Sequence, residues 1–298
     1  MPLQIVSHPD YDAGFAPEHR FPMSKYGHLM DRLGELGLIG GLTQAEPIAA
    51  ARLHLAHDAD YVGQVLACSV PAHIEREIGF PVGERVSRRA QLAAGGTLAA
   101  AHLALAHGVA CNAAGGSHHA RRAQGAGFCT FNDVAIAALA LLDGRLVGSV
   151  LVVDLDVHQG DGTAEILGGN PDVFTFSMHA EKNYPVRKVA SGLDIGLPDG
   201  TGDDVYLEIL VEALARLSRR GEWDLVFYNA GVDPHREDRL GRLALSDDGL
   251  RRRERMVIEH FRDAGIPLCA VIGGGYSTDV AALAARHAIL FETASAFA

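Results

Sequence analysis

The sequence predicts an α/β protein of one domain, an open parallel sheet flanked by helices on both faces. Short apolar runs rich in Val, Leu, Ile and Phe alternate with longer segments whose apolar residues recur at helical spacing. The runs are almost continuously apolar, which is typical of strands buried on both faces. There is no internal repeat and no obvious linker, so we interpret residues 1–298 as a single domain.

The predicted elements follow one another in a regular order. Helices are expected where apolar spacing and end signals agree, with Ser24 and Ser246 as possible caps, at 24–38, 58–66, 85–107, 131–142, 203–217, 247–264 and 278–291. Strands are expected at 3–6, 109–112, 149–156, 173–179, 193–197, 224–231 and 267–273. Residues 48–55 fit either a strand or a short helix.

Composition argues against several classes of protein. The chain has 298 residues and a net charge of −11, so no basic face for nucleic acid is expected. The run Arg251–Arg253 is interpreted as a solvated helix face. The four cysteines form no CxxC pair, no signal peptide is evident and no apolar run approaches membrane-spanning length. We therefore expect a cytoplasmic enzyme with reduced thiols, and the abundance of Arg and Ala over Lys suggests a bacterial source.

The stretch from Val150 to Gly162 carries most of the chemistry. A buried strand leads into Asp154, Asp156, His158 and Asp161. An unpaired buried charge is very costly, so these groups must be paired or hold a metal. Residues two apart in an extended chain point to the same side, so Asp156 and His158 can bind one ion. A carboxylate and an imidazole are typical zinc donors, and the carboxyl end of a parallel strand is where ligands bind.

A catalytic zinc needs a third protein ligand and one open position. Asp233 is the natural candidate, because it follows the predicted strand at 224–231 and stands beside Pro234. Taken alone, Asp233 also fits a turn or capping aspartate. Its place beside the Asp-x-His pair favours the ligand interpretation, with His235 as a rival.

Adjacent histidines stand in the glycine-rich loop after the strand at 109–112. His118 and His119 would be incidental in most loops, but Asp154 and Asp161 have no other evident partner. We therefore predict two Asp–His dyads beside the metal, which fix the tautomer of each imidazole and allow proton transfer. Tyr276 follows three glycines at a strand end. Its phenol can donate a hydrogen bond to an oxyanion, although a surface tyrosine fits equally well without this context.

In this order, these segments resemble the zinc-dependent histone deacetylase family of the arginase/deacetylase superfamily, over nearly the whole chain. The matching segments are 115–120, 125–133, 154–162, 229–233 with 238–241, and 273–276. The run at 158–160, the compact length and the segment at 238–243 look most like class IV enzymes and their bacterial relatives. Ser117 stands where the family usually has a third glycine, and the residues at 121–124 are expected to form a basic rim.

The resemblance implies an arginase/deacetylase-like fold and a role for each matching residue. Zinc would be bound by Asp156, His158 and Asp233, and Tyr276 would assist at the amide oxygen. His119 with Asp161 would be the main base and acid, supported by His118 with Asp154. The acyl-lysine channel would be lined by Gly127, Phe128 and Tyr184. A structural potassium ion would be held by backbone oxygens at Asp154, Asp156, His158, Ser177 and Met178.

The expected function is therefore a zinc amidohydrolase that removes acetyl or longer acyl groups from the side-chain amine of lysine in a protein or peptide. Three alternatives remain. The first is a hydrolase of acetylpolyamine or another acylated small amine. The second is an arginase-like enzyme with two metal ions, and the third is a non-catalytic acyl-lysine binding protein. Neither the acyl-chain length nor the oligomeric state follows from the sequence.

Overall fold

The computed structural model describes residues 1–298 and contains one parallel sheet. The sheet has eight strands in the order β2-β1-β3-β8-β7-β4-β5-β6. Their bounds are β1 Gln4–Ser7, β2 Gly41–Gln44, β3 Val109–Asn112, β4 Val150–Asp154, β5 Val173–Ala180, β6 Leu193–Leu197, β7 Leu225–Asn229 and β8 Leu268–Val271. This arrangement confirms the predicted fold class.

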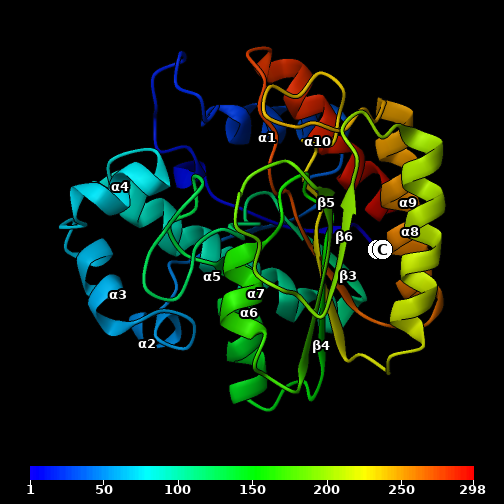
Figure 1. The fold of residues 1–298 in the computed structure, drawn as a ribbon, viewed down its shortest axis with the longest axis horizontal. Helices are drawn as coiled ribbons and strands as arrows, with labels where there is room; N and C mark the ends of the chain where they lie inside the picture. The colour runs from blue at the N-terminus through cyan, green and yellow to red at the C-terminus, as the bar shows by residue number, and fades with distance from the viewer.

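Helices cover both faces of the sheet. Figure 1 shows α6 and α7 on one side of strands β4 to β6, and α8 and α9 on the other. The helices are η1 Pro9–Tyr11, α1 Lys25–Glu35, α2 Ala50–Leu53, α3 Ala59–Leu66, α4 Ala72–Ile78, α5 Glu84–His107, α6 Asp133–Asp143, α7 Asp161–Leu167, α8 Asp203–Ser218, α9 Asp247–Asp263 and α10 Val280–Ser295. One continuous hydrophobic core packs against both faces.

Strand register brings the polar strand ends together. Asp154 at the end of β4 pairs with Asn229 at the end of β7, which in turn pairs with Val271 at the end of β8. All residues of these three strands are buried. Because the strands are parallel and end level, the residues that follow them lie at one edge of the sheet.

Some elements differ from the prediction. Strand β2 and helices α4 and α7 were not predicted, and residues 48–55 contain helix α2. β2 is largely exposed, so it has no apolar run to signal it. Ser246 caps α9 by accepting a hydrogen bond from the backbone N–H of Gly249. Ser24 precedes α1 directly but its side chain makes no capping hydrogen bond, and its backbone is already helical (φ −64°, ψ −10°) whereas a cap residue is normally extended.

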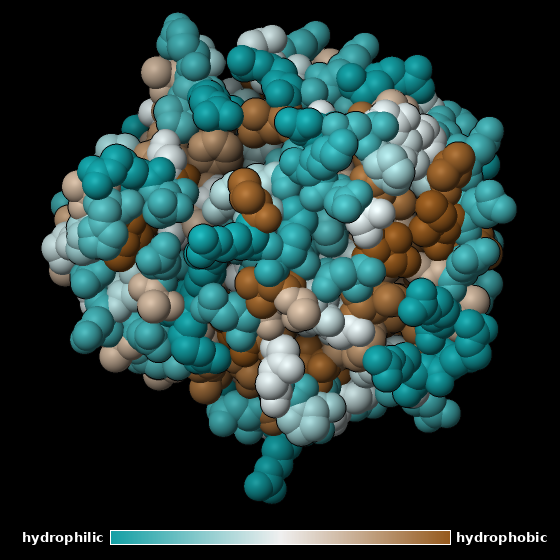
Figure 2. Space-filling view, viewed as in Figure 1, coloured by the Kyte–Doolittle hydropathy of each residue, from teal (hydrophilic) through white to brown (hydrophobic).

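The surface contains both hydrophilic and hydrophobic regions. The face seen in Figure 2 is largely hydrophilic, and a hydrophobic patch lies over α8, where Val205 and Val211 are exposed. No helix is both long and apolar enough to cross a membrane. The two ends of the chain meet, since the amino group of Met1 lies 3.5 Å from the carbonyl oxygen of Ala298.

Candidate active site

Asp156, His158 and Asp233 form a cluster of three possible metal donors beyond the ends of β4 and β7. The Nδ1 atom of His158 lies 3.1 Å from Asp156 Oδ1 and 3.1 Å from Asp233 Oδ2. One ligand atom from each residue lies within 4.8 Å of the others, and all three side chains are buried. The structure therefore brings together the three residues that the sequence predicted.

The convergence of Asp156 and His158 does not come from an extended strand. β4 ends at Asp154, and a bend follows. Asp154 Oδ1 accepts a hydrogen bond from the N–H of Asp156 (3.1 Å), and Asp156 Oδ1 accepts one from the N–H of His158 (3.0 Å). Such bonds to the N–H two residues ahead are Asx turns. Two successive Asx turns therefore direct the side chains of Asp156 and His158 toward each other. The sequence pattern predicted only that these side chains lie close together.

A backbone N–H group also holds the oxygen of each aspartate that does not face His158 Nδ1. Gly274 N–H donates to Asp156 Oδ2 (2.7 Å), and Val157 N–H donates to Asp233 Oδ1 (2.8 Å). The second oxygen of each carboxylate faces His158 Nδ1. Two oxygens and one nitrogen directed at a common point fit a divalent cation such as zinc, and the bonds from the N–H groups of Gly274 and Val157 hold the two carboxylates in this orientation.

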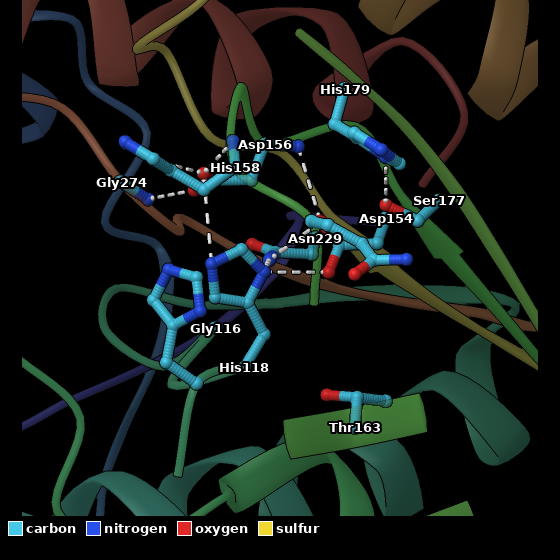
Figure 3. Close-up of polar contacts among 12 residues, drawn as sticks. Gly116, His118, Asp154, Asp156, His158, Thr163, Ser177, His179, Asn229 and Gly274 are labelled. Carbon is cyan, nitrogen blue, oxygen red and sulfur yellow. Dashed lines mark hydrogen bonds and ion pairs between the residues drawn. The ribbon is translucent and has the colours of Figure 1, made fainter. Parts of the chain in front are cut away.

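Gly274 allows this close approach. A Cβ atom at this position would lie 2.2 Å from Asp233 Oδ2 and 2.6 Å from Asp156 Oδ2. Any side chain would therefore collide with both carboxylates. Figure 3 shows Gly274 beside Asp156 and His158.

The two predicted Asp–His dyads are present. His118 Nδ1 donates to Asp154 Oδ2 (2.7 Å), as Figure 3 shows. The other oxygen of Asp154 accepts from the side-chain amide of Asn229 (3.0 Å). His119 Nδ1 donates to Asp161 Oδ1 (2.6 Å). The rings of the two histidines are 4.1 Å apart between centroids, so the dyads lie side by side.

Arg121 completes the second dyad. Its Nε and Nη2 atoms donate to Asp161 Oδ2 at 3.0 and 2.7 Å. The expectation that residues 121–124 form a basic rim is therefore wrong for Arg121, which turns inward to a buried carboxylate. Arg122 donates from Nη2 to the carbonyl of Ile166 and does not line the active-site cavity.

The two histidines differ in proton affinity. Burial lowers the pKa of His119, and the neighbouring His118 lowers it further, to about 4, against the opposing effect of Asp161. Burial acts in the same direction on His118, but the carboxylates of Asp154 and Asp156 outweigh it and raise the pKa of His118 to about 9. A divalent cation on Asp156 would oppose this rise, because its charge compensates the carboxylate.

Tyr276 lies beyond β8 and faces the same cavity. Its ring is 6.2 Å from the ring of His158 between centroids, and its N–H donates to Asp238 Oδ2 (2.7 Å). Burial and the carboxylates of Asp156 and Asp233 raise the pKa of Tyr276 well above its usual range. The phenol therefore keeps its proton and remains available as a hydrogen-bond donor.

The predicted channel residues line a cavity of about 390 Å³ that also contains His119, His158 and Tyr276. The ring of Tyr184 meets that of His119 edge to face, with centroids 4.8 Å apart. Gly127 has a positive φ of 53°, and a Cβ atom there would lie 2.5 Å from His119 Cδ2. Glycine is therefore needed at 127 to bring Phe128 and Tyr184 close to the histidine.

The residues expected around potassium lie on neighbouring segments. Asp154 and Ser177 are partners in the register of β4 and β5, and Met178 follows on β5. The hydroxyl of Ser177 lies 2.9 Å from His179 Nδ1. Potassium binding by their backbone oxygens stays a prediction.

Arg253 is a residue that the sequence interpretation missed. It is fully buried, so the prediction of a solvated helix face is wrong for Arg253, although Arg251 and Arg252 are exposed. Its Nη1 donates to the carbonyls of Leu155 (3.2 Å) and Gly231 (2.8 Å). Arg253 thus joins the two segments that lead into Asp156 and Asp233.

Lys25 and His235 also have roles that the sequence did not predict. Lys25 is fully buried and donates to the carbonyl of Gly273 (3.2 Å), which supports the turn that carries Gly274. His235 is not part of the metal-donor cluster. Its Nε2 atom instead lies 3.3 Å from Asp247 Oδ1.

Comparison with known proteins places the chain in a family. The sequence model of the histone deacetylase domain matches residues 19–291. The chain belongs to the histone deacetylase family. Histone deacetylase 2 of Arabidopsis thaliana is 32% identical to it, over 92% of this chain and 74% of the plant protein. An uncharacterized protein of Picosynechococcus sp. is 47% identical over 99% of both chains.

Solved structures agree with the family assignment. A histone deacetylase homologue complexed with SAHA has a TM-score of 0.81 and 25% identity, covering 98% of this chain and 84% of that one. An acetylpolyamine aminohydrolase from Burkholderia pseudomallei has the same fold, with a TM-score of 0.79, 24% identity and 99% coverage of both chains. The arginase/deacetylase fold is thus confirmed, and membership of this deacetylase family supports a hydrolase.

Proposed function

We propose that this histone deacetylase family member is a zinc-dependent amidohydrolase, with residues 1–298 as one catalytic domain. Its substrate would be an acetylated or longer-chain acylated lysine side chain in a protein or peptide. The observation that carries the proposal is the meeting of three buried metal donors, two Asp–His dyads and a phenol at one cavity. A binding module would need only the cavity and not these proton-transfer groups.

Asp156, His158 and Asp233 would hold the zinc ion. When bound, zinc would polarise the amide carbonyl and lower the pKa of a water molecule. His158 lines the cavity together with His119 and Tyr276, so the donor cluster adjoins this cavity. A substrate amide entering through this cavity would therefore meet all the reacting groups together.

His119 would transfer the protons. Its Nδ1–H is held by Asp161, so its Nε2 is the free base in the neutral ring. Nε2 would take a proton from the water whose oxygen bonds to the amide carbon. It would then give this proton to the nitrogen as the C–N bond breaks, which releases the carboxylic acid, whose acyl oxygen keeps the other water proton, and the free amine. The lowered pKa of His119 keeps the ring neutral at the start of this cycle.

Tyr276 and His118 would act on the charge that develops. The phenol of Tyr276 would donate a hydrogen bond to the carbonyl oxygen as it becomes an oxyanion. The Nε2 atom of His118 lies 3.7 Å from Asp156 Oδ1. His118 would therefore stabilise the arrangement of the donor cluster rather than carry the main proton transfer.

Metal content and acetate release test this proposal together. We expect one zinc ion per chain and release of acetate from an acetyl-lysine peptide, both abolished by Asp156→Asn or by a chelator. Asp172→Asn is a matched control, because Asp172 is exposed and does not line the cavity. Full activity of Asp156→Asn would contradict the proposal. Two manganese ions per chain would instead support the arginase-like alternative.

A further inference from the structure

The active-site cavity opens among positively charged side chains. Apart from the histidines, its charged lining residues are Arg20, Arg76, Lys182 and Arg242, and a single acid, Glu77. All five are exposed, whereas His119, His158 and Tyr276 in the same cavity are buried. The charged residues therefore surround the mouth, and we call the four cations the basic mouth.

Four separate parts of the chain contribute to the basic mouth. Arg20 precedes α1, Arg76 lies on α4, Lys182 follows β5 and Arg242 follows β7. Arg242 is paired with Asp199 at 3.1 Å. Arg20, Arg76 and Lys182 have no carboxylate within the 4.0 Å that defines an ion pair. The whole chain carries a net charge of −11, so this excess of positive charge is local.

We propose that the substrate carries carboxylate groups beside its acylated amine, as in an acidic peptide segment. This inference rests on the proposed function. An amide that reaches His119 and Tyr276 at the buried end of the cavity leaves its neighbouring groups at the mouth. Unpaired cations there attract carboxylates and repel additional ammonium groups. An acetylated polyamine, which carries such ammonium groups, is therefore disfavoured.

Peptides that differ only in charge test the basic mouth. Three acetyl-lysine peptides of equal length would carry Glu, Gln or Lys on both sides of the acetyl-lysine. Exposed ion pairs are weak, so we expect kcat/KM to change about threefold per charge, in the order Glu, Gln, Lys. The change should fall mainly on KM and shrink at high salt, because exposed charges are screened.

Variants connect the preference to particular residues. The double variant Arg76→Gln and Lys182→Gln should remove most of the preference for the Glu peptide. Arg219→Gln is the matched control, since Arg219 is an exposed cation at the end of α8, outside the cavity, and should leave the preference intact. Affinity of each peptide would be measured in parallel by fluorescence anisotropy, which does not require turnover.

The outcomes separate the two proposals. Equal kcat/KM and equal affinity for the three peptides would overturn the basic-mouth inference, and acetate release from them would still support the hydrolase. Charge-dependent affinity that disappears in the double variant would support the basic mouth even without turnover. Two small substrates distinguish the source of the carboxylate. Faster turnover of α-N-blocked acetyl-lysine than of the Glu peptide would support a small carboxylate substrate. A preference for N1-acetylspermidine would overturn the inference.

Discussion

His118 and His119 are consecutive residues with almost the same carboxylate bond, 2.7 Å to Asp154 and 2.6 Å to Asp161. Their pKa values nevertheless shift in opposite directions. Burial and the neighbouring His118 lower the pKa of His119, whereas the carboxylates of Asp154 and Asp156 outweigh burial and raise the pKa of His118. The second oxygens of the two aspartates also differ in their partners. Asp161 Oδ2 is bound by the guanidinium of Arg121, whereas Asp154 Oδ1 accepts only from neutral amides. His118 also faces the carboxylate of Asp156.

The pKa of the histidine in an Asp–His dyad is therefore not determined by the hydrogen bond to the aspartate alone. The guanidinium beside Asp161 acts in the same direction as burial and His118, because a positive charge near Asp161 opposes a proton on His119. The neutral donors around Asp154 leave its charge available to His118. Two Asp–His pairs with similar hydrogen bonds therefore hold one neutral imidazole and one more basic imidazole within the same site.

The largest expected difference is between alanine variants of the two histidines. A positioned general base contributes about 10²–10⁴-fold, so His119→Ala should lower kcat about 10³-fold. His118→Ala should lower it only about tenfold, because in the proposed mechanism His118 supports the site and the main proton transfer falls to His119. Stopped assays of acetate release, with zinc content determined for each variant, measure both effects. Equal losses in the two variants with full zinc content would contradict the division of roles.

His57 is a buried histidine that is not bonded to a carboxylate, so it shows the effect of burial on the pKa without an aspartate partner. His57 Nδ1 lies 2.8 Å from the carbonyl of Arg121, and its Nε2 accepts from the N–H of Asn132 (2.9 Å). Burial lowers the pKa of His57 to about 4, from an ordinary value of 6.5. The unfolded chain therefore binds the proton first as pH falls. The free energy of unfolding should be greatest above pH 6.5 and decrease down to pH 4, by up to about 3 kcal/mol.

Chemical denaturation across this pH range measures the effect of His57. His57→Gln should be less stable at neutral pH but should lose less stability between pH 6.5 and 4 than the wild type. Only the difference between the two proteins is attributed to His57, because other buried histidines titrate in the same range. Parallel curves for the two proteins would show that His57 does not bind the proton on unfolding.

The smallest expected effect comes from Arg121→Gln. Removal of the guanidinium leaves the full charge of Asp161 facing His119, so the pKa of His119 should rise. The acid limb of the kcat/KM profile should then move to higher pH by about one unit, with about tenfold lower activity on that limb. Arg122→Gln is the matched control, since Arg122 does not touch Asp161. If the acid limb of Arg121→Gln does not move, the guanidinium of Arg121 does not contribute to the low pKa of His119.

The sequence predicted which residues meet at the candidate active site better than it predicted the residues that support them and shift their pKa values. Polar residues after buried parallel strands must meet at one sheet edge, so Asp156, His158 and Asp233 could be brought together by topology alone. Arg253 was misread because it stands in an arginine run. Its spacing from Leu250 and Val257, three and four residues away on the buried face of α9, contained the missing signal.

Other features had no local signal in the sequence. The inward turn of Arg121 depends on where the 121–124 loop meets Asp161, and spacing does not specify this. The basic mouth combines residues from four distant parts of an acidic chain. Charge counted along the chain conceals such a patch, because only the fold brings its members together.

The position of β8 in the sheet has a consequence for biosynthesis. β8 is the last strand of the chain, yet it lies between β3 and β7 in the middle of the sheet. Until it emerges from the ribosome, the nascent chain has two separate groups of strands with open edges, which are prone to mispairing. The segment after β8 also supplies Gly274 and Tyr276. The candidate active site is therefore complete only after all eight strands have been synthesised, and products truncated before Gly274 would lack part of it.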